Sequence, residues 1–436
     1  MSLLYWSLLY WDTREKEGCL RRLQLDDDVL DTIFDSAIKN KNIIKNRQVL
    51  TIDYVPDKLL FRTKESTTIA QSLSVILKKG RPSNLLIFGK PGTGKTAVVK
   101  NVIEHLYSKT SQLGMNLRVP FINAKNSNTP YKILYEIAEL LDINKEERKM
   151  QVYFTGLSMS EATDRILDFI KRKSIKIVLV IDEIDSLVNK KGDDILYNFT
   201  RANQRISSDQ FISLIGISNS LTFKDKLDPR VKSSLSEEEL VFNPYTVEQL
   251  KQILVDRCKL AFYDNVIPMG VINLCAAIAG RETGDARKAI DLLRVAAEIA
   301  ERSTTMKITE DHIRSAQQKI DSDTNFEILS NSTLHTKLVI LSIIKSKNGS
   351  TGEIYTVYQY FCSKLQQEPL TQRRMTQIIG ELDQLGLITT NIVNQGRYGR
   401  TQRIKLHIHI SSVKEAIKND PLLSPFIDDI NSWNLF

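Results

Sequence analysis

One short segment constrains the fold of this 436-residue chain more than any other. Residues 89–96, GKPGTGKT, follow the apolar run LLIF and precede the helical pattern AVVKNVIEHLYS. A glycine-rich loop of this spacing between a buried strand and a helix is the phosphate-binding loop (P-loop) pattern, and the strand–loop–helix context makes the match specific. The segment therefore predicts a nucleotide-binding α/β domain.

The residue types in this loop each have a chemical purpose. Glycines allow backbone amides to curl around phosphates at a helix start, Lys95 neutralises the β- and γ-phosphates, and the Thr96 hydroxyl ligates Mg²⁺. The expected cofactors are ATP or ADP with Mg²⁺. The predicted nucleotide contacts in this segment are Gly89, Pro91, Gly92, Thr93, Gly94, Lys95, Thr96 and Ala97.

Two further apolar runs end in polar residues that suit phosphate chemistry. The run IVLVIDEID ends in acids, of which Asp182 is expected to hold the metal and Glu183 to orient or deprotonate the attacking water. Asp185 fits a helix N-cap better. The run FISLIGISNS ends in Asn219, which is predicted to position water at the γ-phosphate, the alternative being a turn residue.

Periodicity divides the chain into several domains, as its length also predicts. Strands alternate with helices up to residue 242, the pattern is purely helical after Pro244, and a third domain ends in a β-hairpin pattern. The expected fold is α/β: a P-loop ATPase core with a parallel sheet, an α-helical lid and a C-terminal winged helix. The predicted ranges are an extension at 1–50, the nucleotide-binding base at 51–242, the lid at 243–321, a linker at 322–333, the winged helix at 334–410 and a tail at 411–436.

Composition and cysteine usage exclude several classes of protein. With 42% hydrophobic and 26% charged residues, the chain is neither wholly disordered nor a membrane protein. The four cysteines have no paired spacing and no histidines at metal-site distances, which argues against zinc and a disulfide framework. No signal peptide or membrane-spanning run is apparent, so a cytoplasmic location is expected.

The C-terminal third combines positive charge with a helix-turn-helix pattern. Residues 334–410 contain ten Lys or Arg against four acids, an excess that charge alone does not distinguish from a solvated surface. The helix at 371–386 has core spacing on one face and polar residues on the other, as a recognition helix does. The predicted DNA contacts are Thr371, Gln372, Arg373, Arg374 and Gln377 on this helix and Arg397, Tyr398, Arg400 and Arg403 on the hairpin. A protein-docking winged helix is the alternative.

Taken in order, the three nucleotide-site elements resemble those of AAA+ ATPases. Three further segments, YVPDKLLFRTKE (54–65), LDPRVKSSLSEEELVFNPYT (227–246) and GDARKAIDLLRVAAEIA (284–300), resemble the archaeal origin-recognition and cell-division-control replication initiators. The resemblance extends over about residues 54–410. It implies slow ATP hydrolysis used as a switch, binding to double-stranded origin DNA in the nucleoid, and partnership with the minichromosome maintenance helicase and other initiator paralogues.

The same resemblance implies roles for four further residues. Arg287 in GDAR would sense nucleotide from the lid, Arg230 would be an arginine finger, and Tyr245 and Arg257 would contact nucleotide from the lid side. Simpler roles stay open: hinge packing for Tyr245, surface ion pairs for Arg257 and Arg230, and a tie between lid helices for Arg287. Family resemblance also suggests that residues 126–137 form a helix that touches DNA, a surface helix being the alternative.

Two departures from the family pattern weaken particular assignments. Residues 61–63, Phe-Arg-Thr, replace a His-Arg-Glu-like triplet, which puts adenine contacts there in doubt. Ser234 stands where some relatives carry a second arginine, which weakens the case for hydrolysis in trans.

Two other functions compete with that of an initiator. A nucleotide-regulated transcription factor also joins a P-loop domain to a winged helix, although the GDARK segment favours an initiator. A remodelling ATPase that acts independently of DNA would leave the basic hairpin unexplained.

Overall fold

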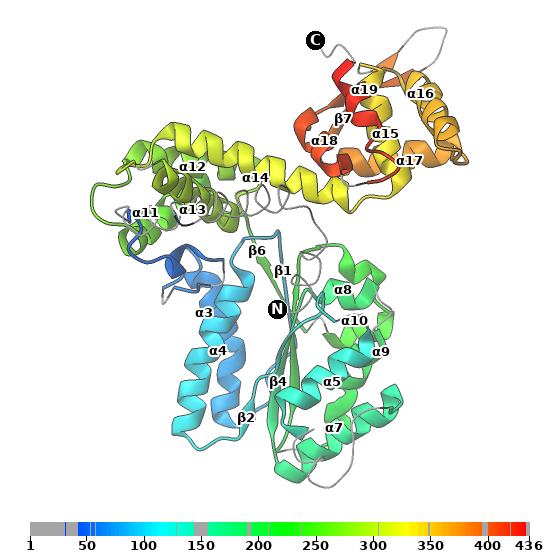
Figure 1. Ribbon diagram of the computed structural model, residues 1–436. Coiled ribbons are helices and arrows are strands. Elements are labelled where there is room, and N and C mark those ends of the chain that lie inside the picture. Colours follow the sequence, from blue (N-terminus) through cyan, green and yellow to red (C-terminus); the bar gives the residue numbers. More distant parts are fainter. Residues whose placement is uncertain are drawn as a thin grey trace, which may run out of the picture. The chain divides into compact units, whose positions relative to one another are not determined.

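A computed structural model describes most of the chain: residue 31 and residues 42–52, 54–56, 58–127, 129–143, 156–189, 193–207, 209–235, 237–303, 305–347, 349–394, 400–418 and 420–432. The chain forms two compact units, residues 1–313 and 314–436, which are described separately below (Figure 1). Within the described residues, no helix combines the length and the apolar character needed to cross a membrane.

The first unit contains the parallel sheet that the alternating pattern predicts. Its strands are β1 (Leu85–Gly89), β2 (Leu117–Arg118), β3 (Phe121–Asn123), β4 (Lys176–Asp182), β5 (Ile212–Ser218) and β6 (Glu238–Phe242). They run in the order β2-β4-β5-β1-β6, with β3 also paired to β4, and every described pairing is parallel. Strands β4 and β5 are apolar and buried along nearly their whole length, as expected for a sheet covered on both faces.

Helices cover both faces of this sheet (Figure 1). On one face of the sheet, α3 (Thr63–Ser74) and α4 (Lys95–Gln112) pack against alternate strand residues such as Ile87 and Val180. Leu86 and Ile181 point to the other face. The helices there are α5 (Pro130–Leu140), α7 (Met159–Lys173), α8 (Ile184–Asn189), α9 (Asp193–Arg201) and α10 (Pro229–Leu235). The period of two along each strand thus produces a three-layer α/β/α base.

The lid follows the base and is helical, as predicted. Its helices are α11 (Val247–Ala261), α12 (Met269–Glu282), α13 (Ala286–Arg302) and the start of α14 (Glu310–Ser330). Thr246 and Gln249 form a capping box at the start of α11, and Asp285 caps α13 by accepting from the amides of Arg287 and Lys288. These caps satisfy amides that have no partner within the helix.

The last part of the predicted extension, residues 42–50, packs on the lid and therefore belongs to the folded first unit. Ile43, Ile44, Val49 and Leu50 are buried, the last two in the short 3-10 helix η2 (Gln48–Leu50). The Lys45 amide donates to the Ala261 carbonyl at 2.7 Å. These apolar residues are few and lie among basic and polar ones, so the sequence pattern did not predict that they would be buried. The earlier part of the predicted extension, residues 1–41, lies outside the described residues apart from position 31.

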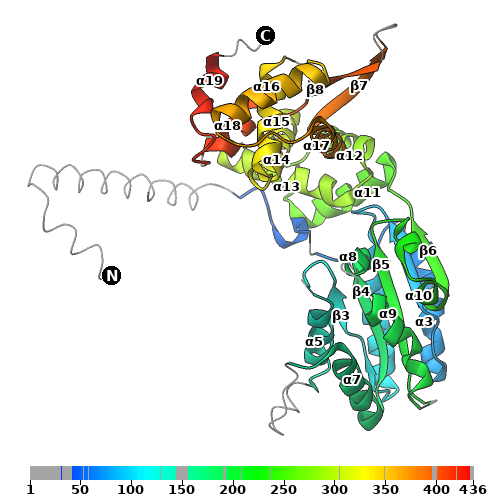
Figure 2. The ribbon, with the colours of Figure 1, turned by 90° about the vertical axis from the view of Figure 1, so that its right-hand side faces the viewer.

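The second unit is a winged helix with added helices. It contains α15 (Leu334–Lys345), α16 (Thr351–Lys364), α17 (Gln372–Gln384), the hairpin strands β7 (Ile388–Asn394) and β8 (Arg400–Leu406), α18 (Ile410–Lys418) and α19 (Phe426–Ser432). Strands β7 and β8 are antiparallel, and Figure 2 shows the hairpin extending away from the helices of this unit. The three predicted helices and the hairpin are confirmed.

Two boundaries differ from the predicted ones in this region. The stretch expected to be a linker, residues 322–333, is helical as far as Ser330, because α14 continues through its polar sequence and buries Leu329 in the core of the second unit. The stretch expected to be a tail, residues 411–436, contributes α18 and α19 to the same core through Val413, Ile417 and Phe426. Short amphipathic helices after a hairpin carry too few apolar positions to distinguish them from a tail.

The buried position of α19 generates a stability prediction. Phe426 is 4% exposed and its ring meets Phe361 edge-on at 5.1 Å, so Phe426→Ala should destabilise the second unit by about 3–5 kcal/mol. Hydrogen exchange of the full chain should show faster exchange in α15 and α16 and unchanged exchange in the sheet of the first unit. Leu422→Ala is the control, since Leu422 is 47% exposed. Unchanged protection of α15 and α16 in Phe426→Ala would mean that α19 is dispensable.

Candidate active site

The order of the strands brings the three predicted polar strand ends together. Strands β4, β5 and β1 are adjacent and parallel, so their carboxyl ends meet at one edge of the sheet. The P-loop follows β1, Asp182 and Glu183 end β4, and Asn219 follows β5. Ligands of open α/β sheets bind at this edge. The structure therefore unites residues that lie as far as 130 positions apart in the chain, among them Gly89 and Asn219.

Lys95 lies at the centre of this edge and is 5% exposed. Its ammonium donates to the Gly89 and Lys90 carbonyls at 2.7 and 2.8 Å and to Asn219 Oδ1 at 2.9 Å. The pKa of Lys95 is lowered to about 8, mainly by burial; Asp182 opposes this shift and nearby Arg287 adds to it. Asn219 is thus a partner of the phosphate-binding lysine, and its predicted contact with water stays a prediction.

The two acids at the end of β4 take different positions. The Thr96 hydroxyl donates to Asp182 Oδ2 at 2.8 Å, and the Glu183 amide donates to Asp182 Oδ1 at 2.9 Å. Glu183 has φ of 52°, in the left-handed region that non-glycine residues rarely adopt. Its side chain is 26% exposed and lies 4.0 Å from the Lys125 ammonium. The turn therefore directs one carboxylate toward Thr96 and leaves the second accessible to solvent.

The donor set fits a magnesium ion that arrives with a nucleotide. Thr96 and Asp182 place a hydroxyl and a carboxylate at one point, and Mg²⁺ usually takes one or two such protein ligands beside waters and substrate phosphates. Among the described residues there is no group of three or more His, Cys, Asp or Glu side chains that would hold a metal by itself.

Asp185 differs from the predicted N-cap. It lies in the first turn of α8, and its Oδ1 accepts from the Ser218 hydroxyl at 2.9 Å and from the Asn219 amide at 3.4 Å. Its carboxylate therefore joins the ends of β4 and β5 and orients the backbone that carries Asn219.

The lid contacts the P-loop directly at two glycines. Gly92 has φ of 70°, and a Cβ there would lie 1.6 Å from Asp285 Oδ1. Gly94 has φ of 88°, and a Cβ there would lie 2.8 Å from the Tyr245 hydroxyl. The Ala286 amide donates to the Gly92 carbonyl at 3.2 Å. Both glycines are needed for backbone conformation and also for the close approach of the lid.

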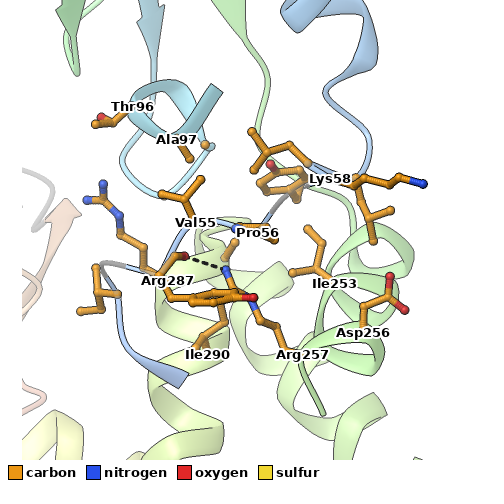
Figure 3. A pocket seen from close by; sticks show the side chains of 18 of the residues that line it. Val55, Pro56, Lys58, Thr96, Ala97, Ile253, Asp256, Arg257, Arg287 and Ile290 are labelled. Carbon is orange, nitrogen blue, oxygen red and sulfur yellow. Dashed lines mark hydrogen bonds between the residues drawn. The ribbon is translucent and has the colours of Figure 1, made fainter. Parts of the chain in front are cut away.

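A cavity of about 220 Å³ lies beside the P-loop between base and lid. Thr96 and Ala97 line it from the start of α4, Ile253 and Arg257 from α11, and Arg287 and Ile290 from α13 (Figure 3). Val55 and Pro56, from the segment before α3, complete an apolar wall. Apolar walls with a few polar groups are typical of cofactor sites, and this one adjoins the phosphate-binding loop.

The four residues with roles implied by resemblance lie in different surroundings. Arg287 is exposed and lines the cavity, and Tyr245 is 6% exposed against Gly94. Arg257 lines the cavity but donates to the Val49 and Tyr54 carbonyls at 2.9 and 3.0 Å, so it is no surface ion pair. Arg230 is 66% exposed and paired with Asp228 at 2.8 Å. Contact of these residues with nucleotide remains a prediction.

Sequence reasoning missed four residues that contribute to the site. Arg62, noted only as part of an unusual triplet, is 4% exposed and donates to the Thr93 carbonyl of the P-loop at 2.9 Å. Asp285 meets Gly92, and Val55 and Pro56 form part of the cavity wall. The segments that contain them were quoted for their resemblance, but burial and contact across the hinge leave no signal in one sequence.

The predicted recognition helix has the expected faces within the second unit. Met375, Ile378 and Ile379 are buried. The opposite face is exposed and carries Thr371, Gln372, Arg373, Arg374 and Gln377. Thr371 caps α17 by accepting from the Arg374 amide, and Arg374 donates to Gln377 Oε1 at 3.0 Å.

The hairpin residues are only partly described. Arg403 is exposed on β8, and Arg400 begins that strand. Arg397 and Tyr398 lie outside the described residues. The basic face of α17 and the basic strand β8 thus belong to the same unit, while the tip of the hairpin stays a prediction.

Family models match three stretches of the chain. They are an AAA domain at residues 78–222, the Cdc6 AAA+ ATPase-type lid domain at 251–318 and the CDC6 C-terminal winged helix domain at 327–416. The ORC1-type DNA replication proteins of Cenarchaeum symbiosum and Thermococcus kodakarensis are each 43% identical, over 94% and 92% of this chain and 99% and 97% of their own. The solved structure of the Aeropyrum pernix ORC1 protein in complex with DNA is similar with a TM-score of 0.77 and 42% identity, over 88% of this chain and 100% of that one.

The positions of Lys95 and Glu183 predict that substitutions there affect different steps, ATP binding for Lys95 and ATP turnover for Glu183. Lys95→Ala should abolish ATP binding, because the buried ammonium supplies the charge that faces the phosphates. Glu183→Gln should keep ATP binding and stop turnover, because the predicted role of this side chain is to orient or deprotonate water. Equilibrium titration with ATP and a phosphate-release assay measure the two effects. Equal loss of binding in both variants would contradict the assigned roles.

The lowered pKa of Lys95 predicts a pH dependence of nucleotide affinity. Below pH 8 the lysine is charged and affinity should be constant, whereas above pH 8 the free enzyme loses this proton and ADP affinity should fall by up to about tenfold per pH unit. Titrations of ADP from pH 7 to 9.5 measure this fall. A flat wild-type profile would show that Lys95 keeps its ordinary pKa.

Proposed function

The chain belongs to the family of ORC1-type DNA replication proteins, and on this premise we propose that it is an ATP-dependent initiator that binds double-stranded DNA at replication origins. It is an AAA+ ATPase with a nucleotide-binding core, a lid and a winged helix. The proposal is supported most by one combination of features. The lid contacts the P-loop at Gly92 and Gly94, and the second unit of the same chain exposes the basic face of α17.

In this proposal the base, the lid and their joint cavity bind ATP with Mg²⁺. Gly89, Pro91, Thr93 and the rest of the P-loop surround the phosphates, and Lys95 holds a positive charge against them. Thr96 and Asp182 hold Mg²⁺, which polarises the phosphates when bound. The adenine fits the apolar wall formed by Val55, Ile253 and Ile290.

Hydrolysis would follow from the positions of the remaining polar groups. Glu183 accepts a proton from water, Asn219 orients that water beside Lys95, and Arg287 adds charge from the lid. Arg230 is exposed and can reach a neighbouring copy as an arginine finger. We propose slow turnover, so that the bound nucleotide acts as a switch between two lid positions.

The proposed partners follow from the function of the family. Related structures include the Aeropyrum pernix ORC1 protein with DNA, and we propose that this chain binds origin DNA in the same manner. We further propose that it works with other initiator paralogues in the cytoplasm, at the nucleoid, and helps to recruit or load the minichromosome maintenance helicase. The helix α5 (Pro130–Leu140), which overlaps the segment predicted at 126–137, is a further candidate for DNA contact.

Protection of origin DNA tests this function against the main alternative. An initiator should protect replication-origin sequences in footprinting, with protection that differs between ATP and ADP. A nucleotide-regulated transcription factor should instead protect promoters. Protection of promoter DNA alone would overturn the proposal.

The basic residues of α17 and those in the hairpin sequence predict two kinds of DNA contact. Arg397→Ala with Arg400→Ala should weaken binding to all DNA and flatten the salt dependence by up to about two units, since each lost phosphate contact is worth nearly one. Arg373→Ala or Arg374→Ala should instead narrow the gap between origin and random DNA by about 1–3 kcal/mol, because a helix in the major groove reads bases. Salt titrations on an origin fragment and a shuffled control measure both.

Contrary outcomes are easily recognised in the same titrations. A wild-type salt slope in the hairpin double variant would show that the hairpin does not touch the DNA backbone. An unchanged preference for origin DNA in both helix variants would show that α17 does not read bases.

A further inference from the structure

Arg62 is the most completely enclosed charged side chain in the hinge region of the first unit. It precedes α3 directly and follows Phe61, whose φ of 60° turns the backbone at this point. Its side chain is 5% exposed, although a guanidinium is among the groups that cost most to remove from water. A buried guanidinium needs acceptors for its N–H groups. The acceptors around Arg62 therefore show which parts of the chain it connects.

The partners of Arg62 come from three separate parts of the chain. Nε donates to the Thr93 carbonyl of the P-loop at 2.9 Å, and Nη2 donates to the Asn243 carbonyl at the hinge at 2.6 Å. Nη1 pairs with Glu65 at 2.8 Å. The guanidinium carbon Cζ lies over the Tyr245 ring, 4.0 Å from its centre, at the start of the lid. One side chain therefore joins the P-loop, the hinge and the lid.

The same stretch of the P-loop is held at successive residues. The Gly92 carbonyl accepts from the Ala286 amide at the start of α13, and the Thr93 carbonyl accepts from Arg62. The Tyr245 hydroxyl approaches Gly94 so closely that no Cβ fits there. The Tyr245 amide in turn donates to the Gly284 carbonyl at 3.2 Å, in the turn before α13. The path from Thr93 to α13 thus runs through Arg62 and Tyr245.

We propose that Arg62 is a positioning residue that locks the hinge to the P-loop and thereby brings Arg287 of α13 to the phosphates. This inference rests on the proposed nucleotide function. Arg62 is not among the residues that line the described cavity, whereas Arg287 is. In this proposal Arg62 acts on nucleotide through the lid, and Arg287 is the residue that faces the cavity.

The geometry requires arginine and not simply a positive charge. Different nitrogens of one rigid, planar group donate to the Thr93 and Asn243 carbonyls, and the carbon of this group lies over the Tyr245 ring. A lysine ammonium is a point charge that cannot span both carbonyls while stacking on a ring. Arg62→Lys therefore keeps the charge and removes the connection between P-loop and hinge.

A double-mutant cycle in the full-length protein tests the proposal. Arg62→Lys, Arg287→Ala and the double variant are titrated with ATP. Each single change should weaken ATP binding about tenfold, and the double variant should be no more than about tenfold weaker than wild type, because Arg287 contributes only when Arg62 holds the lid. A merely structural role for Arg62 predicts additive losses, about a hundredfold in the double variant.

Two companion variants keep the result interpretable. Arg81→Lys alters a half-exposed arginine paired with Glu237 and should leave ATP affinity unchanged. If Arg62→Lys lowers the melting temperature too far, Glu65→Gln removes only the ion pair and should weaken ATP binding by a smaller factor, an effect that disappears in the Arg287→Ala background. Additive losses of ATP affinity in the double variant, or wild-type ATP affinity in Arg62→Lys, would overturn the positioning role of Arg62 and leave the proposed function standing. Failure of wild type to bind ATP would overturn the proposed function instead.

Discussion

The arrangement of the first unit depends on the hydrogen bonds made by the buried ammonium of Lys95. Keeping the charged form there costs about 3 kcal/mol relative to an exposed lysine, as its pKa of about 8 indicates. Its partners are two P-loop carbonyls and the Asn219 side chain after β5. These partners exist only if β1 and β5 are neighbours and parallel. The sheet order thus has a local chemical reason as well as a hydrophobic one.

The second constraint is that the nucleotide cavity belongs to neither the base nor the lid alone. The apolar wall at Val55 and Pro56 comes from a segment that is held on the lid by Arg257, whose guanidinium donates to the carbonyls of Val49 and Tyr54. The lid residue Glu301 accepts from the amides of Ile43 and Ile44. Residues before the base therefore shape the cavity while packing on the lid.

The sequence predicted the parts of this arrangement that local chemistry specifies. The P-loop, the acids at the end of β4 and the helix α17 each combine a periodic apolar pattern with polar residues at set spacing, and the structure places these elements where they were predicted, while their contacts with nucleotide and DNA stay predictions. The linker at 322–333 and the tail at 411–436 were wrong, because a polar helix and a short helix become ordered only by packing on the second unit's core. Arg62 escaped notice since burial and long-range partners are not encoded at adjacent positions.

The contact between lid and P-loop makes nucleotide affinity and lid position two aspects of one equilibrium. Asp285 approaches Gly92 so closely that a lid in this position excludes any side chain there, and its cap orders the turn that carries Arg287. A nucleotide that binds more tightly with the lid in this position must favour that position by its difference in affinity. By reciprocity, any partner that moves the lid must change nucleotide affinity by the same factor. Arg62 and Tyr245 connect the P-loop to the lid. The hinge at residues 243–245 is therefore where lid position and nucleotide affinity are coupled.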